Sequence, residues 1–191
     1  MAPTHSKDAF LWRGNHPLLD FVNTERMLDG DRLDLLDSPR AFADWLGHAG
    51  LPGSWSGDGW EILGQAKVFR AAMRRMAQSL AEGREVAAEA AQVINQVLAE
   101  QRGHFRVEGD HPPYHRHFLA DGKGHPLLSL ALSASDLLCS QDLSLVRHCQ
   151  NEACILFFLD VTRNHTRRWC SMQSCGNRAK VAAHYQRMKA R

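Results

Sequence analysis

The stretch CSMQSCGNRAK, residues 170–180, places two cysteines four residues apart and runs directly into a Gly-Asn-Arg triplet. An earlier pair has the same spacing, and fifteen residues separate the two pairs. Each pair can form a tight knuckle that aims two sulfurs at one point, which suits tetrahedral zinc. Four thiolates leave no open coordination position. The pattern therefore predicts one structural Zn²⁺ ion, against the alternative of four unrelated thiols, with the ligands Cys149, Cys154, Cys170 and Cys175.

Short apolar segments and a helix-forming tail surround these cysteines. Residues 155–159 favour a β-strand, and residues 145–147 can form its partner. The tail AKVAAHYQRMKAR follows the last cysteine, so a hairpin and a C-terminal helix would together make a treble-clef-like zinc finger. On that helix Val181, Tyr185 and Met188 form one stripe, which we expect to pack on the hairpin. The neighbouring stripe presents cations.

Charge is distributed unevenly along the chain. Residues 147–191 contain nine Lys and Arg against Glu152 and Asp160, a formal charge of +7, which four thiolates and one zinc ion would lower to +5. Since the whole chain carries +2, the first 146 residues carry −5. A basic segment on an acidic body favours a polyanionic partner, although a solvated basic face is the alternative. The candidate DNA-binding residues are Arg163, Arg167, Arg168, Arg178, Lys180, Arg187 and Arg191.

The region before the cysteines has helical periodicity. Apolar residues between Ile62 and Leu80 recur every three or four positions, and similar patterns fall at residues 86–97 and 127–138. Pro17 and the pair Ser38-Pro39 mark two further helix starts. Residues 104–124 alternate around a Gly-Asp-His-Pro-Pro turn and predict a β-hairpin. The fold class is therefore α+β, with a mostly helical domain at 1–143 and the zinc finger at 144–191.

Two segments resemble a known family. FFLDVTRNHTRRWCSMQSCGNRAKVAAHYQR, residues 157–187, resembles the CGNR zinc finger, and LLDFVNTE, residues 18–25, resembles the opening motif of the ABATE domain that usually precedes it. Proteins of this family are regarded as stress-induced bacterial transcriptional regulators. The resemblance implies that the finger binds DNA and that the ABATE-like domain senses an effector.

Polar residues within the LLDFVNTE stretch are candidates for that effector site. Asp20, Asn23 and Thr24 lie among apolar neighbours and either line a ligand pocket or satisfy hydrogen bonds at a helix end. Cys139 lies in an apolar helical stretch and is expected to be an inert core thiol. The sequence contains no Gly-rich phosphate loop, nucleophile elbow or open metal site, so we expect no enzymatic activity.

The partners and the location follow from the same features. We expect DNA, a small-molecule effector and a homodimer as candidate partners, and no membrane, because the longest apolar run, residues 153–159, is far below the roughly 20 residues that span a bilayer. The N-terminus lacks a secretory signal pattern, so a cytoplasmic location is expected. The alternative function is a zinc-stabilised protein-interaction or dimerisation module without DNA binding.

Overall fold

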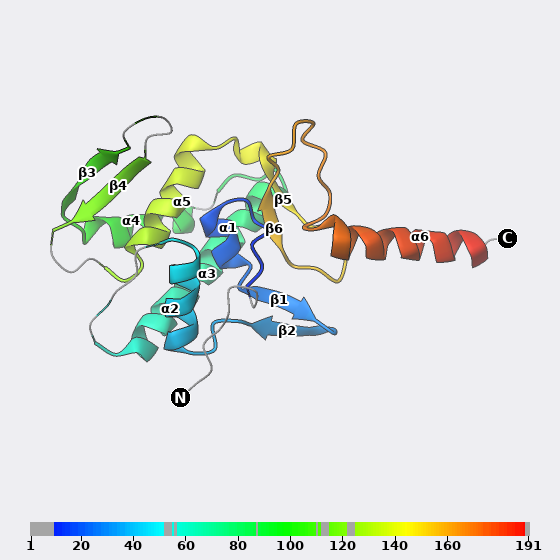
Figure 1. The fold of residues 1–191 in the computed structure, drawn as a ribbon, viewed down its shortest axis with the longest axis horizontal. Coiled ribbons are helices and arrows are strands. Elements are labelled where there is room, and N and C mark those ends of the chain that lie inside the picture. The colour runs from blue at the N-terminus through cyan, green and yellow to red at the C-terminus, as the bar shows by residue number, and fades with distance from the viewer. Residues whose placement is uncertain are drawn as a thin grey trace.

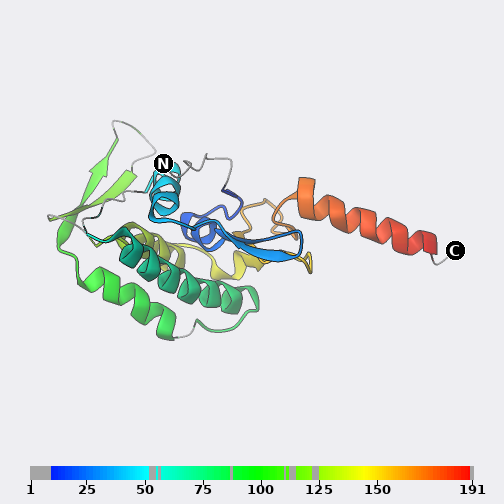
Figure 2. The same cartoon turned by 90° about the horizontal axis from the view of Figure 1, so that it is seen from below.

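Helix α3 (Gly59–Ala81) is the central element of the helical part of the chain. The computed structural model describes residues 10–51, 55, 57–86, 88–109, 111, 115–121 and 125–189. The Asp58 carboxylate caps the helix by accepting from the backbone N of Trp60 at 2.8 Å. Helix α4 (Ala88–Ala99) packs beside α3, and α5 (Leu128–Ser140) packs beside α4 (Figures 1 and 2). The three predicted periodic segments are therefore helices.

The two predicted helix starts are also confirmed. Helix α1 (Pro17–Val22) begins where the His16 ring accepts a hydrogen bond from the backbone N of Leu18. Helix α2 (Pro39–His48) begins where the Ser38 hydroxyl accepts from the backbone N of Ala41 at 3.1 Å. These helices bury their aromatic side chains against α3, and the ring centroids of Phe21 and Trp45 lie 5.2 Å apart. The main hydrophobic core lies at this contact.

Two antiparallel hairpins extend from the helical part. Strands β3 (Gly103–Glu108) and β4 (His115–Ala120) form the predicted hairpin. Strands β1 (Glu25–Leu28) and β2 (Asp31–Asp34) form a second one, which sequence reasoning missed. Its turn residues Asp29 and Gly30 have φ values of 52° and 96°. The Asp-Gly dipeptide was the available signal, because tight hairpin turns require positive φ at both positions.

A buried arginine fastens the β1–β2 hairpin to α3. Both Arg70 terminal nitrogens donate to the carboxylate of Asp34 at 2.8 Å, and one also donates to the hydroxyl of Thr24 at 2.7 Å. Lys67 adds an ion pair to the same carboxylate at 2.9 Å. Although burial would raise the pKa of Asp34, the hydrogen bonds from Arg70 and Lys67 lower it to about 2. The hairpin is therefore held by charge as well as by packing.

The predicted hairpin of the zinc finger lies between two hydrophobic cores and contributes side chains to both. Strand β5 (Val146–His148) pairs with β6 (Phe157–Leu159), and Val146 lies opposite Leu159. Because side chains alternate along a strand, Phe157 and Leu159 lie in the main core while Phe158 joins the smaller core around the cysteines. The segments predicted as 1–143 and 144–191 thus share a continuous hydrophobic interior.

The last helix of the structure projects away from the rest of the protein. A single π-helical turn, η3 (Met172–Gly176), leads into α6 (Asn177–Lys189), which projects away from the other elements in both views (Figures 1 and 2). The expectation that its apolar stripe packs on the hairpin was wrong, because Val181, Tyr185 and Met188 are 53%, 64% and 60% exposed. Within the described residues, no helix has both the length and the apolar character needed to cross a membrane.

Candidate metal centre and nucleic-acid interface

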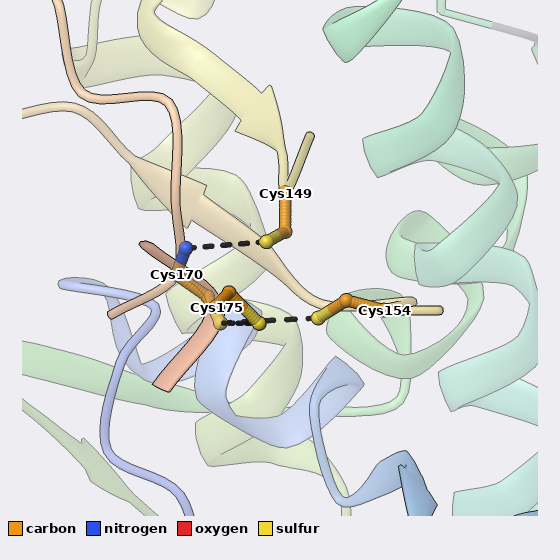
Figure 3. Close-up of side chains that lie close together, drawn as sticks. All are labelled: Cys149, Cys154, Cys170 and Cys175. Atoms are coloured by element: carbon orange, nitrogen blue, oxygen red, sulfur yellow. Dashed lines mark hydrogen bonds between the residues drawn. The ribbon is translucent and has the colours of Figure 1, made fainter. Parts of the chain in front are cut away.

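The four predicted zinc ligands lie together at the base of α6 (Figure 3). Their sulfurs all lie within 4.8 Å of one another, and Cys170 Sγ is 3.8 Å from Cys154 Sγ and 3.6 Å from Cys175 Sγ. Four thiolates about 2.3 Å from a tetrahedral zinc ion stand about 3.8 Å apart, so the residues fit the ion. These separations are too long for a disulfide, whose sulfurs lie about 2.05 Å apart.

The fifth cysteine stands apart from this cluster. Cys139 lies near the end of α5 and is exposed, so the expectation of a buried core thiol was wrong. The α5 residues that face the main core are instead Leu130, Ala131, Ala134 and Leu137. In the part of the chain that the structure describes, the four clustered cysteines are the one group placed to hold a metal ion.

Local backbone turns position both cysteine pairs. The backbone N of Cys149 donates to the carbonyl of Leu156 at 2.9 Å, and that of Cys154 donates to the carbonyl of Asn151 at 2.8 Å, so the first pair forms a tight turn between β5 and β6. The second pair approaches from the other side, where the backbone N of Cys170 donates to Cys149 Sγ at 3.4 Å. The segment between the two pairs, residues 155–169, therefore brings the second pair of cysteines against the first.

The cluster is electrostatically suited to a cation. Hydrogen bonds from Cys154 and Cys170 lower the pKa of the Cys149 thiol to about 2. The same hydrogen bonds raise the pKa of Cys154 to about 12 and raise that of Cys170. Without a cation, one thiolate is favoured and further ionisation is opposed by the negative charge already present. A bound Zn²⁺ ion deprotonates all four thiols, and because the site is then closed, its role is structural.

Arg167 stabilises the backbone next to the metal centre. Its guanidinium donates to the carbonyls of Trp169, Cys170 and Arg13 at 3.0, 2.7 and 2.9 Å and lies 4.0 Å from the centroid of the Phe158 ring. Its guanidinium is thus engaged with the protein itself, which supports a structural role, while its DNA contact stays a prediction.

The buried carboxylate of Asp160 organises the loop of residues 160–167, which precedes Cys170. It accepts from the backbone N and the hydroxyl of Thr162 at 3.0 and 2.6 Å, and from the backbone N of Arg167 at 2.9 Å. Burial would raise the pKa of Asp160, but these hydrogen bonds lower it. The carboxylate therefore stays charged and holds residues 160–167 in a compact turn beside the zinc site.

The remaining basic candidates are at the surface. Arg168 donates to Gln150 Oε1 at 2.5 Å and lies over the Trp169 ring at 5.2 Å, so it is exposed but oriented. Arg191 lies outside the described residues. The other candidates are exposed and have no ion pair within the described ranges: Arg163, Arg178, Lys180 and Arg187. The structure thus leaves five of the seven predicted cations exposed at the surface of the finger.

Gly176 and Asn177 join the metal centre to α6. A Cβ atom on Gly176 would lie 2.8 Å from Met172 Sδ and 3.2 Å from Trp169 Cδ1, so the absence of a side chain allows this close packing. The Asn177 side chain donates to the carbonyl of Gln173 at 3.2 Å. Arg178 follows at the surface. In the triplet after Cys175, the first two residues therefore shape the joint and the third presents a charge.

The candidate effector residues form hydrogen bonds within the protein. Asp20 accepts from the backbone N of Arg13 and Gly14 at 2.8 and 2.7 Å, and Thr24 donates to the carbonyl of Phe21 at 2.7 Å. Asn23 donates to the carbonyl of Phe157 at 2.8 Å and accepts from its backbone N at 2.9 Å. These contacts support the helix-end alternative. Burial, the largest effect, raises the pKa of Asp20 to about 6.

Three arginines form contacts between the helical part of the chain and the zinc finger. The sequence analysis did not predict these contacts. Arg74 of α3 donates to the carbonyls of Ile155 and Val22 at 2.9 and 2.5 Å, and Arg13 donates to the hydroxyl of Ser174 at 3.1 Å. With Arg167, they connect the finger to the segment that precedes α1 and to α3. No spacing rule signals such contacts, because they join residues far apart in the sequence.

The fold and the centre together define a helical domain joined to a structural four-cysteine zinc finger. The chain belongs to the ABATE family, whose model, described as "Putative stress-induced transcription regulator", matches residues 15–141. The model of the CGNR zinc finger matches residues 146–188. Both matches agree with the predicted order of the two segments, and neither family is described as an enzyme. No curated protein matches the chain.

Proposed function

We propose that the protein is a bacterial transcriptional regulator that binds DNA through its zinc finger and responds to a small molecule through its helical domain. The observation that carries DNA binding is α6. This helix buries none of its side chains, contains no acidic residue and presents four cations: Arg178, Lys180, Arg187 and Lys189. A cytoplasmic location is part of the proposal, because reduced thiols are available there to hold zinc.

The dimensions of α6 suit a groove of duplex DNA. A helix of 13 residues is about 20 Å long and about 10 Å across, and the major groove is about 12 Å wide. Such a helix is only marginally stable by itself, so an external partner would stabilise it. Arg163 and Arg168 lie on the loop before η3 and are also exposed. Most of these cations would contact phosphates, which position a protein without reading sequence.

Zinc has a positioning role in this proposal. Cys175 lies in η3, one residue before the glycine that leads into α6, so the metal fixes the point from which the helix projects. Arg167 holds the carbonyl of Cys170 on the same side of the centre. Loss of the ion would release the start of the helix. DNA affinity should therefore depend on zinc even though zinc touches no nucleotide.

A second candidate function rests on the apolar stripe of α6. Val181, Tyr185 and Met188 are each more than half exposed, and Met172 of η3 is 52% exposed. Exposed apolar groups on one face of a helix are typical of association surfaces. A finger that dimerises through this stripe would keep its self-association when Arg187 is changed to Glu, because the contact would be apolar. A DNA-binding finger would instead lose affinity for duplex DNA.

Recovery of chromosomal fragments tests the proposed function. Full-length protein is incubated with sheared DNA from its source organism, and bound fragments are sequenced and compared with those bound by Cys170→Ser. We expect fragments to be enriched by the unmodified protein and by the control Cys139→Ser, and not by Cys170→Ser. Absence of enrichment with zinc-loaded protein would contradict DNA binding, and concentration-dependent dimers seen in sedimentation would then favour the second candidate.

A further inference from the structure

A cleft of about 850 Å³ lies between the β3–β4 hairpin, α5 and the start of α1. Its volume falls within the roughly 300 to 1,000 Å³ of small-molecule sites. None of Asp20, Asn23 and Thr24 lines it. The metal centre and α6 do not contribute to it either, so the cleft is a feature separate from the site described above.

Aromatic and aliphatic side chains line one part of the cleft. Phe105 and Phe118 lie directly opposite each other on β3 and β4, and their ring centroids are 5.2 Å apart in an edge-to-face arrangement. Leu128 and Leu132 of α5 also line the cleft. Phe105 is 54% exposed, although an exposed aromatic ring is unfavourable in water. An apolar body placed here would cover it.

Two hydroxyl groups on the α5 side are shielded and unpaired. Ser129 and Ser133 are one helical turn apart and both line the cleft. Their Oγ atoms are buried from solvent and form no hydrogen bond within the described part of the chain. A buried hydroxyl without a partner is unfavourable, and pairs of such groups are rare in folded proteins. Because both atoms are shielded in this structure, a small side-chain rearrangement would have to precede a hydrogen bond from an occupant of the cleft.

Among the charged residues that line the cleft, one arginine has no carboxylate partner in the described part of the chain. Glu108 pairs with Arg106, and Asp136 lies 3.6 Å from the Nε2 atom of His16. Arg116 forms no ion pair with any residue that the structure describes, and its guanidinium lies 4.8 Å from the centroid of the Phe105 ring. A free guanidinium beside an aromatic surface is a recognition pattern for an anion attached to an apolar group.

We propose that this cleft binds a small organic anion with an aromatic or branched hydrocarbon body. The apolar body would lie against Phe105, Phe118 and Leu132, and the anionic group would pair with Arg116. The location also suggests how binding in the cleft could affect the finger. His16 and Pro17 line the cleft, while the adjacent Asn15 donates to the carbonyl of Leu159 in β6 at 3.0 Å. That regulatory consequence rests on the proposed function, whereas binding itself does not.

The test uses two related fluorescent probes on zinc-loaded, full-length protein without DNA. 1-Anilinonaphthalene-8-sulfonate carries an anionic group, and N-phenyl-1-naphthylamine has the same aromatic body without it. We expect saturable binding of the sulfonate at one site, at least about tenfold tighter than binding of the neutral probe, because a charged hydrogen bond is worth about that factor. Decanoate should displace the sulfonate.

Three variants locate the binding. Arg116→Gln should weaken the sulfonate about tenfold and leave the neutral probe unchanged. Ser133→Met, which places a longer side chain in the cleft, should weaken both probes. Arg102→Gln, which removes an exposed arginine outside the cleft lining, should change neither. Near-UV circular dichroism confirms that each variant is folded.

Specific outcomes would overturn the proposal. No saturable sulfonate binding, or binding that neither Arg116→Gln nor Ser133→Met alters, would rule out this cleft. Equal affinity for the two probes would rule out anion recognition. Because no DNA is present, either result would leave the proposed DNA binding untouched, and a failure to recover chromosomal fragments would leave binding in the cleft untouched.

Discussion

Asn23, the C-cap residue of α1, and Phe157 of β6 exchange two hydrogen bonds, although their positions in the sequence are 134 apart. The amide of Asn23 pairs with the strand much as a neighbouring strand would, and the aromatic ring of Phe157 lies in the main core. The residue that the family motif places at the end of α1 is therefore a joint between the helical domain and the zinc finger.

Removing this joint should destabilise the whole protein. Asn23→Ala leaves a buried backbone N–H and a buried carbonyl of Phe157 without partners, which should lower the free energy of unfolding by about 2 to 4 kcal/mol. Urea unfolding of zinc-loaded protein measures the change. Asn95→Ala, on the exposed face of α4, is the matched control and should stay within about 0.5 kcal/mol. A loss below that level for Asn23→Ala would show that the pairing is not important for stability.

Zinc should stabilise both segments because β6 is shared. The unmodified protein and Cys139→Ser should each contain one zinc ion per chain, and Cys175→Ser should contain none. We expect Cys175→Ser to lower the free energy of unfolding of the whole chain by several kcal/mol, since metal binding is coupled to folding. Metal analysis with thermal unfolding followed by far-UV circular dichroism measures both quantities. If the helical transition kept its midpoint after zinc loss, the two segments would be independent.

Gly14 should tolerate no side chain. A Cβ atom there would lie 2.8 Å from the backbone N of Asp20 and 2.9 Å from the carbonyl carbon of Leu19, both of which are fixed by α1. Gly14→Ala should therefore destabilise the protein by about 2 kcal/mol or more. Gly64→Ala is the matched control, because nothing lies within 4 Å of that position on α3, and it should stabilise the protein by up to about 1 kcal/mol. Equal effects of the two substitutions would contradict the proposed close approach.

Mild acid should weaken the fold through His16. Burial, the largest effect, lowers the pKa of His16 despite the nearby Asp136 carboxylate. A histidine whose pKa is lowered in the folded state contributes stability above its unfolded pKa of about 6.5, and that contribution is lost as the pH falls below it.

The His16 effect can be isolated by comparison with His16→Asn, which keeps an N-cap acceptor and removes the titration. Between pH 7.5 and 5.5, with zinc in excess, the free energy of unfolding of the unmodified protein should fall more steeply than that of the variant. Parallel pH profiles would show that His16 does not carry this dependence.

Local signals in the sequence were enough to predict most elements and the metal centre. Cysteine spacing indicated the zinc ligands because each pair is a local turn, and Ser38-Pro39 indicated the start of α2 because capping is also local. The Asp29-Gly30 turn carried an equally local signal for the β1–β2 hairpin, which was overlooked.

Tertiary relationships could not be predicted in this way. The apolar stripe of Val181, Tyr185 and Met188 looks like a packing face, yet the direction in which α6 leaves Cys175 keeps it in solvent. Arg167 has the same charge as Arg168, but only the structure shows that it binds three backbone carbonyls. The polar residues of LLDFVNTE suggested a pocket, whereas the cleft lies among residues of α5 and the β3–β4 hairpin.

The central claim, that α6 binds DNA through its cations, is tested most directly by the salt dependence of affinity for a duplex. Affinity of the unmodified protein should fall steeply between 50 and 200 mM salt, and each lost phosphate contact should reduce the slope of log K against log salt by about 0.9. Lys180→Gln with Arg187→Gln should therefore reduce the slope by about 1.8, while the control pair Arg40→Gln with Arg102→Gln should not change it. A flat dependence, or equal slopes for the two double variants, would contradict the claim.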